Sequence, residues 1–204
     1  MSAVTMDRAT AQALLLHAAK NDVRHYLNTV ALEVAADRCI AIATDGTTLL
    51  ATTEGVELRE PPPCRDGTYL VDRVALEPAL KTKNKDVLTF TFDADDPQRV
   101  VVTAAAAQFH SRVDGKFPDW RRVVHRPADS EGHPAAIAPE FLTRCTQSIS
   151  LLCTGRKTAA ANYANALVPY GPNRAAIAVG DDYVDVCMSR SDPFDDPKPL
   201  PAWV

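Results

Sequence analysis

The sequence lacks any long apolar run, any paired cysteine motif and any strong excess of charge of one sign. No stretch approaches the roughly 20 apolar residues that a membrane-spanning helix needs. The first residues contain no basic segment followed by an apolar one, so we expect no secretory signal and a cytoplasmic protein. The five cysteines of the 204-residue chain form no C-x-x-C motif. Cys39, Cys145 and Cys187 lie within apolar runs, so we expect buried free thiols there.

Motifs for metal binding and catalysis are also missing. The five histidines show no ligand spacing with one another or with the cysteines, which predicts neither a metal site nor a cofactor. The chain contains no nucleophile elbow, phosphate-binding loop or zinc-protease motif. Most acidic residues lie in predicted turns, where aspartate is common for backbone reasons. We therefore expect a binding protein rather than an enzyme, with a hydrolase of unrecognised site as the weakest alternative.

What the sequence does contain is a pattern of one helix followed by antiparallel strands. The composition, 46% hydrophobic and 24% charged, suits a globular protein with its own core. Residues 7–20 are predicted to be helical because Ala11, Leu14, Leu15 and Ala18 recur on one helical face. Strands are predicted at 26–35, 39–44 and 47–53, and Asp45-Gly46 is a strong hairpin signal between the last two.

A second unit of the same kind follows the prolines at 61–63. A strand is predicted at 68–71, and further strands at 87–92, 99–103 and 105–113. The helix between them falls within 72–83. Proline removes a backbone donor and clashes with the preceding turn, so this helix should start near Pro78 or kink there.

The third unit begins at Pro139, a favourable first-turn position for a helix. Its predicted strands are 164–169, 175–179 and 183–188. The first and third units align without gaps at an offset of 135, so that Leu14 falls on Ile149 and Ile42 on Ile177. The agreement in helix length, strand length and turn position favours a genuine repeat over chance.

Three strings carry a resemblance to a known family. They are Asp22-Val23-Arg24-His25-Tyr26-Leu27-Asn28, Ala43-Thr44-Asp45-Gly46 and Val113-Asp114-Gly115-Lys116-Phe117-Pro118-Asp119-Trp120-Arg121-Arg122-Val123. In this order and spacing they resemble the middle domain of the bacterial DNA sliding clamp, the β subunit of DNA polymerase III. Residues 139–190 resemble only half of the following domain.

The resemblance implies an α+β DNA-clamp fold with helix-plus-antiparallel-meander half-units repeated about three times. In this family two half-units related by a local twofold form a domain, with helices on the inside of a ring and sheets outside. The expected organisation is a complete clamp-like domain (1–125), a linker (126–138), a half domain (139–190) and a proline-rich tail (191–204).

The charge distribution agrees with helices that face DNA. The three helix-containing windows 7–25, 72–85 and 139–157 hold ten basic and five acidic residues, a net charge of +5. The whole chain carries −4, so the remainder carries −4 minus 5, or −9. A basic helical layer suits a protein whose helices meet phosphates. The alternative is ordinary scatter, because helices favour Lys and Arg in any case.

The resemblance also implies two sets of site residues. The candidate DNA-binding residues are Asn21, Arg24, His25, Tyr26 and the basic cluster Lys81, Lys83 and Lys85. The candidate partner-peptide pocket is Leu27, Thr44, Gly46, Thr47, Thr48, Leu49, Pro118, Arg122 and Val123. The alternatives are that Tyr26 caps the core, and that Leu27, Leu49 and Val123 belong to the core. The family's last strand also lines this pocket, and we expect it to be missing here.

The predicted function is therefore that of a DNA sliding-clamp-like processivity platform. It would contact double-stranded DNA and dock peptides of a DNA polymerase or clamp loader. The alternative is a clamp-like protein-binding regulator that does not encircle DNA. Family rings hold twelve half-units, so a chain with three is expected to be at least a dimer, and a tetrameric ring is the larger possibility. A monomer whose tail covers the bare sheet edge is the alternative.

Overall fold

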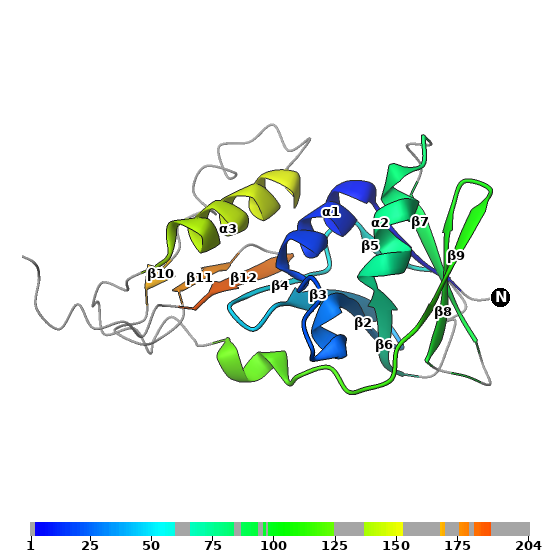
Figure 1. The fold of residues 1–204 in the computed structure, drawn as a ribbon, viewed down its shortest axis with the longest axis horizontal. Helices are drawn as coiled ribbons and strands as arrows, with labels where there is room; N and C mark the ends of the chain where they lie inside the picture. The colour runs from blue at the N-terminus through cyan, green and yellow to red at the C-terminus, as the bar shows by residue number, and fades with distance from the viewer. Residues whose placement is uncertain are drawn as a thin grey trace, which may run out of the picture.

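The computed structural model describes residues 3–59, 66–83, 87–93, 96, 98–124, 137–152, 168–169, 176–179 and 182–188, and only the backbone of 168–169 and 176–179. Figure 1 shows three helices and two sheets. The helices are α1 (Arg8–His17), α2 (Arg73–Lys81) and α3 (Pro139–Leu152), with 3₁₀ helices at His25–Asn28 and Trp120–Val123. The strands are β1 (Ala3–Met6), β2 (Thr29–Ala35), β3 (Arg38–Thr44), β4 (Thr48–Thr52), β5 (Val56–Leu58), β6 (Gly67–Asp72), β7 (Leu88–Phe92), β8 (Arg99–Ala104), β9 (Ala107–Arg112), β10 (Val168–Pro169), β11 (Ala176–Val179) and β12 (Tyr183–Cys187).

The predicted helix-and-strand order of the first unit is confirmed, with two differences. Residues 26–28 were predicted as strand but belong to a 3₁₀ helix, in which the Leu27 amide donates to the Arg24 carbonyl at 2.8 Å. This tight turn carries the chain from α1 to the sheet. Strands β1 and β5 were not predicted, because they are only four and three residues long. Such short segments are too brief to show alternation.

The second helix begins at Arg73, so the expectation that it starts near Pro78 is wrong. Asp72 caps it by accepting a hydrogen bond from the Val74 amide at 2.9 Å. Pro78 lies inside the helix, where its missing amide would have bonded to the Val74 carbonyl. Val74 is 77% exposed, so water can hydrate that carbonyl and the helix tolerates the proline.

The first two units exchange their first strands. The seven-stranded sheet has the order β10-β11-β12-β4-β3-β2-β6, and the five-stranded sheet has the order β5-β1-β7-β8-β9. Strand β6 of the second unit thus pairs with β2 of the first, and β1 pairs with β7 of the second. This reciprocal pairing joins the two units into one domain with an approximate local twofold.

The helix starts repeat this symmetry at the level of residues. The pair Asp7-Arg8 opens α1 and Asp72-Arg73 opens α2, and both aspartates are helix caps. Arg73 donates to the Leu15 and Ala18 carbonyls at 2.9 and 2.8 Å, at the end of α1. Arg8 in turn donates to the carbonyls of residues 79, 80 and 82, at the end of α2. Each helix therefore has its carbonyl end satisfied by a cation from the other.

The third unit extends the sheet of the first. Strand β12 pairs antiparallel with β4, and Asp185 faces Leu50 in the register. These two residues are 135 apart in sequence, so each strand pairs with its own repeat across a second local twofold. This geometry confirms the predicted repeat. Helices α1 and α3 pack against each other over the junction.

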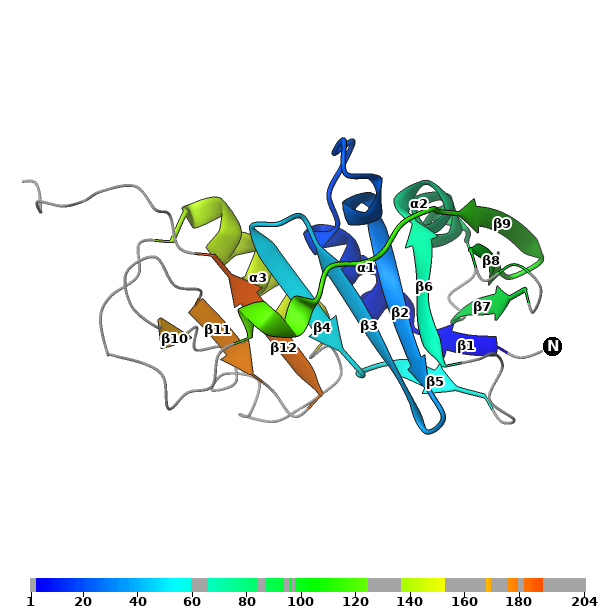
Figure 2. The ribbon, with the colours of Figure 1, turned by 90° about the horizontal axis from the view of Figure 1, so that it is seen from below.

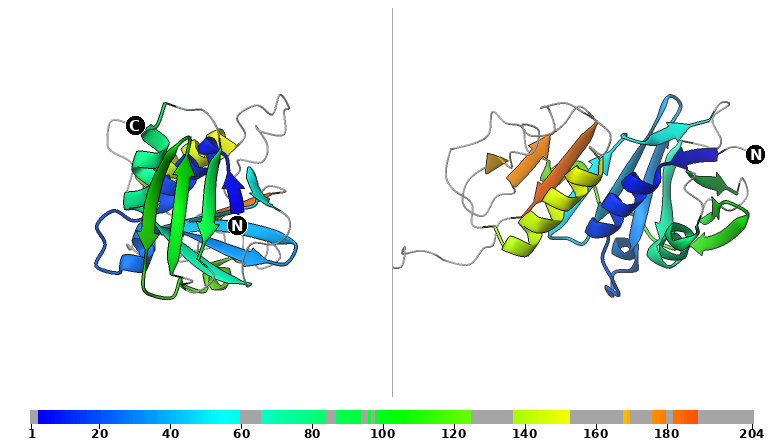
Figure 3. Two further views of the ribbon diagram at one scale, coloured as in Figure 1. Left: turned by 90° about the vertical axis from the view of Figure 1, so that its right-hand side faces the viewer. Right: turned by 90° about the horizontal axis from the view of Figure 1, so that it is seen from above.

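Helices α1 and α3 cover one face of the seven-stranded sheet, and α2 packs mainly on β8 and β9 of the five-stranded sheet (Figures 1 and 3). The main apolar core lies beneath them and continues between the two sheets. On the opposite face, residues 113–124 run across the strands (Figure 2). A second, smaller core lies under this segment, around Ile42, Leu49, Phe117 and Val186. The α+β clamp-like fold class predicted from the sequence is confirmed.

Candidate functional site

A cleft with a volume of about 240 Å³ opens on the face of the sheet opposite the helices. It lies where the 3₁₀ helix Trp120–Val123 covers β4 and β12 (Figure 2). Four chain segments build it, from the first unit, from residues 113–124 and from the third unit. Its lining residues are Arg24, Tyr26, Leu27, Thr44, Gly46, Thr47, Thr48, Leu49, Pro118, Asp119, Trp120, Val123, Val186 and Met188.

Eight of the nine residues predicted for the partner pocket line this cleft. Arg122 does not line it; its side chain is exposed beside the wall residue Val123. Leu27 and Leu49 are only 2% and 4% exposed, so they belong to the core and also form the cleft floor. The two interpretations of these leucines are therefore compatible. Tyr26, whose predicted contact with DNA stays a prediction, lines the cleft and packs on the smaller core.

One wall of the cleft comes from the third unit. Strand β12 of the third unit supplies Val186 and Met188 to the cleft. The Met188 amide donates to the Thr47 carbonyl at 2.9 Å, which holds this wall against the β3–β4 turn. The sequence prediction missed both residues because it treated 183–188 as a generic strand. The repeat offset of 135 aligns Val186 and Met188 with Ala51 and Thr53, which do not line the cleft, so it gave no signal for these two residues.

The β3–β4 turn is a rigid lip of the cleft. Asp45 Oδ1 accepts hydrogen bonds from the Thr47 and Thr48 amides at 2.8 and 2.9 Å, and Gly46 adopts a positive φ of 90°. Arg144 of α3 donates to Asp45 and, at 3.0 Å, to Thr48 Oγ1. Burial alone would raise the pKa of Asp45, but these hydrogen bonds outweigh it and hold the pKa below its usual range. The lip is thereby tied to the third unit.

The opposite wall is fixed to β2 by Glu33. Trp120 Nε1 donates to Glu33 at 3.3 Å, and Arg121 donates to both carboxylate oxygens at 2.9 and 2.6 Å. The Arg121 guanidinium also lies 4.4 Å from the Trp120 ring centroid. The hydrogen bonds from Arg121 are the main cause of the lowered pKa of Glu33. An apolar cleft with two prefixed walls can accept large apolar side chains of a peptide with little rearrangement.

A second, more open groove of about 670 Å³ lies beside the loop after α1. Asn21 and His25, both predicted to bind DNA, line it together with Val23, which is 88% exposed. The Arg24 side chain lines the cleft rather than this groove, and its guanidinium pairs with the Asp22 carboxylate at 2.8 Å. This hydrogen-bonded pair lowers the pKa of Asp22 to about 2.

The basic residues of the helical layer divide into two classes. Arg8, Arg73 and Arg144 are hydrogen-bonded to neighbouring elements, as described above. Lys20, Lys81 and Lys83 are exposed, while Lys85 lies outside the described residues. Part of the positive charge counted from the sequence is therefore used in hydrogen bonds within the fold.

A buried polar cluster lies between α1, α3 and β12, at the junction of the first and third units. His17 Nε2 is 3.6 Å from Asp185 Oδ2, and both side chains are fully buried. Burial raises the pKa of Asp185 to about 6, and burial lowers that of His17 to about 3. Ser148 Oγ lies 2.7 Å from Asp185 Oδ2 and 2.9 Å from the Cys145 carbonyl. A protonated Asp185 can thus donate a hydrogen bond to Ser148 Oγ, which in turn donates to the Cys145 carbonyl.

This cluster has no access to solvent, so it is not a catalytic site. Contact with Cys187, together with burial, raises the pKa of the Cys145 thiol and keeps it protonated. Cys39, Cys145 and Cys187 are buried thiols outside any disulfide, as predicted; Cys64 and Cys153 lie outside the described residues. Within the described part of the chain, no group of three or more His, Cys, Asp or Glu side chains is placed to hold a metal ion. No helix in that part is long and apolar enough to cross a membrane.

Comparison with known proteins places the fold. No protein-family model and no curated protein sequence matches the chain. Among solved structures, the DNA polymerase III β subunit of Pseudomonas aeruginosa superposes with a TM-score of 0.57 over 93% of this chain and 66% of that protein, at 17% identity. The β subunit of Thermotoga maritima gives a TM-score of 0.63 over 99% of this chain and 68% of that protein, at 13% identity.

A third structure is a Pseudomonas aeruginosa sliding clamp bound to griselimycin, with a TM-score of 0.55 and 18% identity. It is covered over 65% of its length, and this chain over 92%. The chain thus spans about two thirds of the length of these clamps and has their fold. The resemblance inferred from the three sequence strings is confirmed at the level of the fold.

Proposed function

We propose that this protein is a non-enzymatic, sliding-clamp-like platform of DNA replication whose cleft docks short peptides of partner proteins. The observation that carries the proposal is the assembly of the cleft from segments far apart in the chain. Leu27 and Leu49 form its floor, Pro118 and Val123 one wall, and Met188 the other. Eight of the nine residues that the sequence predicted for a peptide pocket line this cleft.

The chemistry of the cleft suits an apolar peptide anchor. Its interior is mainly aliphatic and aromatic, and the partly exposed Thr47 and the exposed Arg24 can hydrogen-bond to a peptide backbone. The two walls are already held in place by Glu33 and by the Asp45 turn, so docking orders few protein side chains. Pre-organisation of this kind raises affinity for a short ligand.

The test is binding of a linear peptide that binds the Pseudomonas aeruginosa clamp, measured by calorimetry. Wild-type protein should bind it, and Leu49→Asp should abolish binding. Met188→Glu changes a wall residue that is only partly buried, and should do the same with less effect on the core. Leu142→Asp is the matched control, because Leu142 is exposed on α3, away from the cleft. Absence of binding to the wild-type chain would refute the proposal.

DNA contact is the second part of the proposed function. The helical face carries Lys20, Lys81 and Lys83, and the groove beside it carries Asn21 and His25. Changing Lys81, Lys83 and Lys85 to Glu should weaken DNA binding and reduce the slope of log K against log salt by up to about 3, since each phosphate contact contributes about 0.9.

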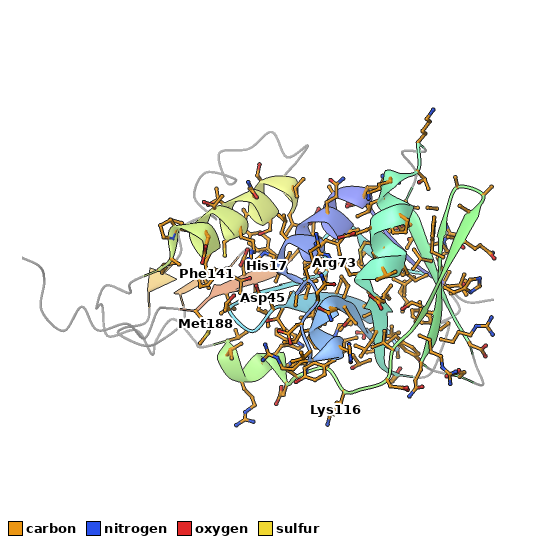
Figure 4. The ribbon with its side chains drawn as sticks, in the orientation of Figure 1. His17, Asp45, Arg73, Lys116, Phe141 and Met188 are labelled. Carbon is orange, nitrogen blue, oxygen red and sulfur yellow. The ribbon has the colours of Figure 1, made fainter. Side chains whose placement is uncertain are left out.

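A matched pair of single variants locates the surface. Lys81→Glu should weaken binding to double-stranded DNA at low salt, because Lys81 extends from the helical layer. Lys116→Glu removes the same charge from the opposite side of the molecule, where Figure 4 places it, and should have little effect. Equal effects of the two variants would show that the helical face is not the DNA-binding surface.

The alternative function is a clamp-like regulator that binds partner peptides without encircling DNA. It is favoured by the use of Arg8, Arg73 and Arg144 within the fold, which leaves few exposed cations among the described residues of the helices. Retention on nicked circular DNA that is lost on linearisation supports a ring. The proposed ring needs self-association, at least a dimer, so light scattering that gives a monomer mass at high concentration supports the regulator.

A further inference from the structure

The described part of the chain ends at Met188, a residue that lines the cleft. Met188 is the last residue described, its side chain lines the cleft, and its amide is fixed to the Thr47 carbonyl at 2.9 Å. Residues 189–204 continue from this point and lie outside the described residues. Whatever their conformation, they are tethered at the rim of an apolar hollow.

The sequence of this segment combines one aromatic residue with flanking aspartates and prolines, features that suit a peptide ligand. It reads Ser-Arg-Ser-Asp-Pro-Phe-Asp-Asp-Pro-Lys-Pro-Leu-Pro-Ala-Trp-Val. Phe194 is its first large apolar residue, and it stands between Asp192-Pro193 and Asp195-Asp196-Pro197. Asp-Pro pairs favour chain reversal, so the segment can return toward the point from which it leaves. Prolines also reduce the entropy lost when a peptide is ordered on a surface.

We propose that residues 189–204 are a built-in ligand of the cleft, with Phe194 as the side chain that enters it. This inference rests on the proposed function of the cleft as a peptide-docking site. Phe194 is six residues beyond Met188, so the tether reaches at most about 20 Å at 3.3–3.6 Å per residue. The cleft lies well within that distance because Met188 itself lines it. Trp203 is nine residues farther along, and a longer tether lowers the effective concentration.

Charge at the rim supports this occupant. The Arg24 side chain is 51% exposed although it pairs with Asp22, and the exposed Arg122 stands beside Val123. Both can meet the carboxylates that flank Phe194. Asp119 also lines the cleft and opposes them. The aromatic anchor therefore supplies the main part of the interaction, and the arginines orient it.

Occupation by its own segment makes the cleft a competitive site. A short flexible tether presents its ligand at an effective concentration in the millimolar range. If the free segment binds with a Kd on the order of 100 μM, an outside peptide sees its affinity reduced about tenfold. A partner peptide then has to exceed this threshold in order to dock.

The experiment uses full-length protein and a fluorescein-labelled peptide with the sequence of residues 189–204, followed by fluorescence anisotropy. The Phe194→Ala protein should bind the labelled peptide about tenfold more tightly than wild type, because its own anchor is gone. Trp203→Ala is the matched control and should behave like wild type. Adding Leu49→Asp or Met188→Glu to Phe194→Ala should abolish binding, which assigns the signal to the cleft.

The outcomes separate this inference from the function on which it rests. If Phe194→Ala protein binds the linear clamp-binding peptide but not the labelled segment, the built-in ligand is refuted and the docking site stands. If it binds neither peptide, both proposals fail. Equal affinity of wild type, Phe194→Ala and Trp203→Ala for the labelled segment would show that the segment does not occupy the cleft within its own chain.

Discussion

The first unit of this protein meets its two neighbours by different chemistry. Its junction with the second unit is an exchange of strands β1 and β6 over an apolar core, closed by Arg8 and Arg73 on the ends of the helices. Its junction with the third unit is a pairing of β4 with β12 over the buried polar pair His17 and Asp185. The apolar core continues across both junctions, but among the described residues only the junction with the third unit encloses a fully buried ionisable pair.

The difference matters because the cleft lies at the junction with the third unit. Val186 and Met188 of the third unit face Leu27 and Leu49 of the first across it. Arg144 ties the lip at Asp45 to α3, which also carries Ser148 of the buried cluster. The junction with the second unit thus supports the domain, while the junction with the third controls the shape of the cleft.

The largest effect is expected from truncating the apolar junction. Phe90 of β7 is fully buried and pairs with Val4 of the exchanged strand β1. Phe90→Ala should lower the free energy of unfolding by about 3–5 kcal/mol in urea titrations, through lost burial and a cavity. Phe109→Ala, on a partly exposed position of the same sheet, should cost less than half as much. Equal losses would contradict the assignment of the junction to apolar burial.

The buried pair at the junction with the third unit should make the free energy of unfolding depend on pH. Asp185 has a raised pKa, so the folded state retains a proton that the unfolded state releases, and its contribution to stability is lost as pH rises from about 4 to about 6. His17 has a lowered pKa, so its contribution is lost as pH falls from about 6.5 toward 3. Between pH 4 and 6 the two slopes oppose each other.

Single variants separate these slopes. Relative to wild type, Asp185→Asn should gain stability as pH rises from 4 to 6, by on the order of 3 kcal/mol, since a pKa difference of one corresponds to about 1.4 kcal/mol. His17→Leu should show the opposite trend over the same range. The measurement is chemical denaturation at several pH values, with differences taken from wild type. Parallel pH profiles for the two variants would show that the pair does not titrate as described.

A smaller effect is expected from the helix-end arginines. Arg73→Ala leaves the Leu15 and Ala18 carbonyls without their charged donor and should cost about 2 kcal/mol, the scale of hydrogen bonds to a charged group. Arg99→Ala is a suitable comparison, because Arg99 forms an exposed ion pair with Asp93 at 3.7 Å. That change should stay within about 1 kcal/mol. Similar values for both would mean that the reciprocal caps contribute no more than a surface pair.

The smallest effect on stability is expected at the cleft wall. Glu33→Gln removes the charge that fixes Arg121 and Trp120, and should lower the unfolding free energy by about 1 kcal/mol or less. Peptide binding should nevertheless weaken several-fold, because the wall at Trp120 is no longer pre-organised. Calorimetry on the same preparation compares the two quantities. A stability loss without any change in affinity would separate this ion pair from the cleft.

Much of this arrangement could be predicted from sequence, for identifiable reasons. The helices and long strands follow from periodic apolar positions such as Leu14 and Leu15, and from the Asp45-Gly46 turn. The cleft residues were found because they lie in strings with a specific order and spacing. The strand exchange was not predictable, because β1 is four residues long and entirely buried, so it carries no alternation. Nothing local in its sequence says that it pairs with β7.

The roles of the charged residues were the least predictable part. Counting Arg8, Arg73 and Arg144 as DNA-facing cations ignored the carbonyl and carboxylate acceptors that tertiary structure brings to them. Those acceptors come from elements 54 to 99 residues away in sequence. The buried pair of His17 and Asp185 has the same origin, since neither residue differs from a surface residue in its local sequence. Long-range contacts decide the environment of such groups, and one-dimensional patterns do not reveal them.

The exchanged strand also constrains how the protein is made. Ala3 precedes its pairing partner, Thr91 of β7, by 88 residues in the chain (91 − 3). At 5–20 residues per second, the strand waits roughly 4 to 18 s for that partner to be synthesised. During this time the nascent first unit exposes an apolar strand and an unfilled sheet edge, both of which attract wrong partners. Folding during synthesis therefore requires that β1 stay unpaired until translation has passed β7.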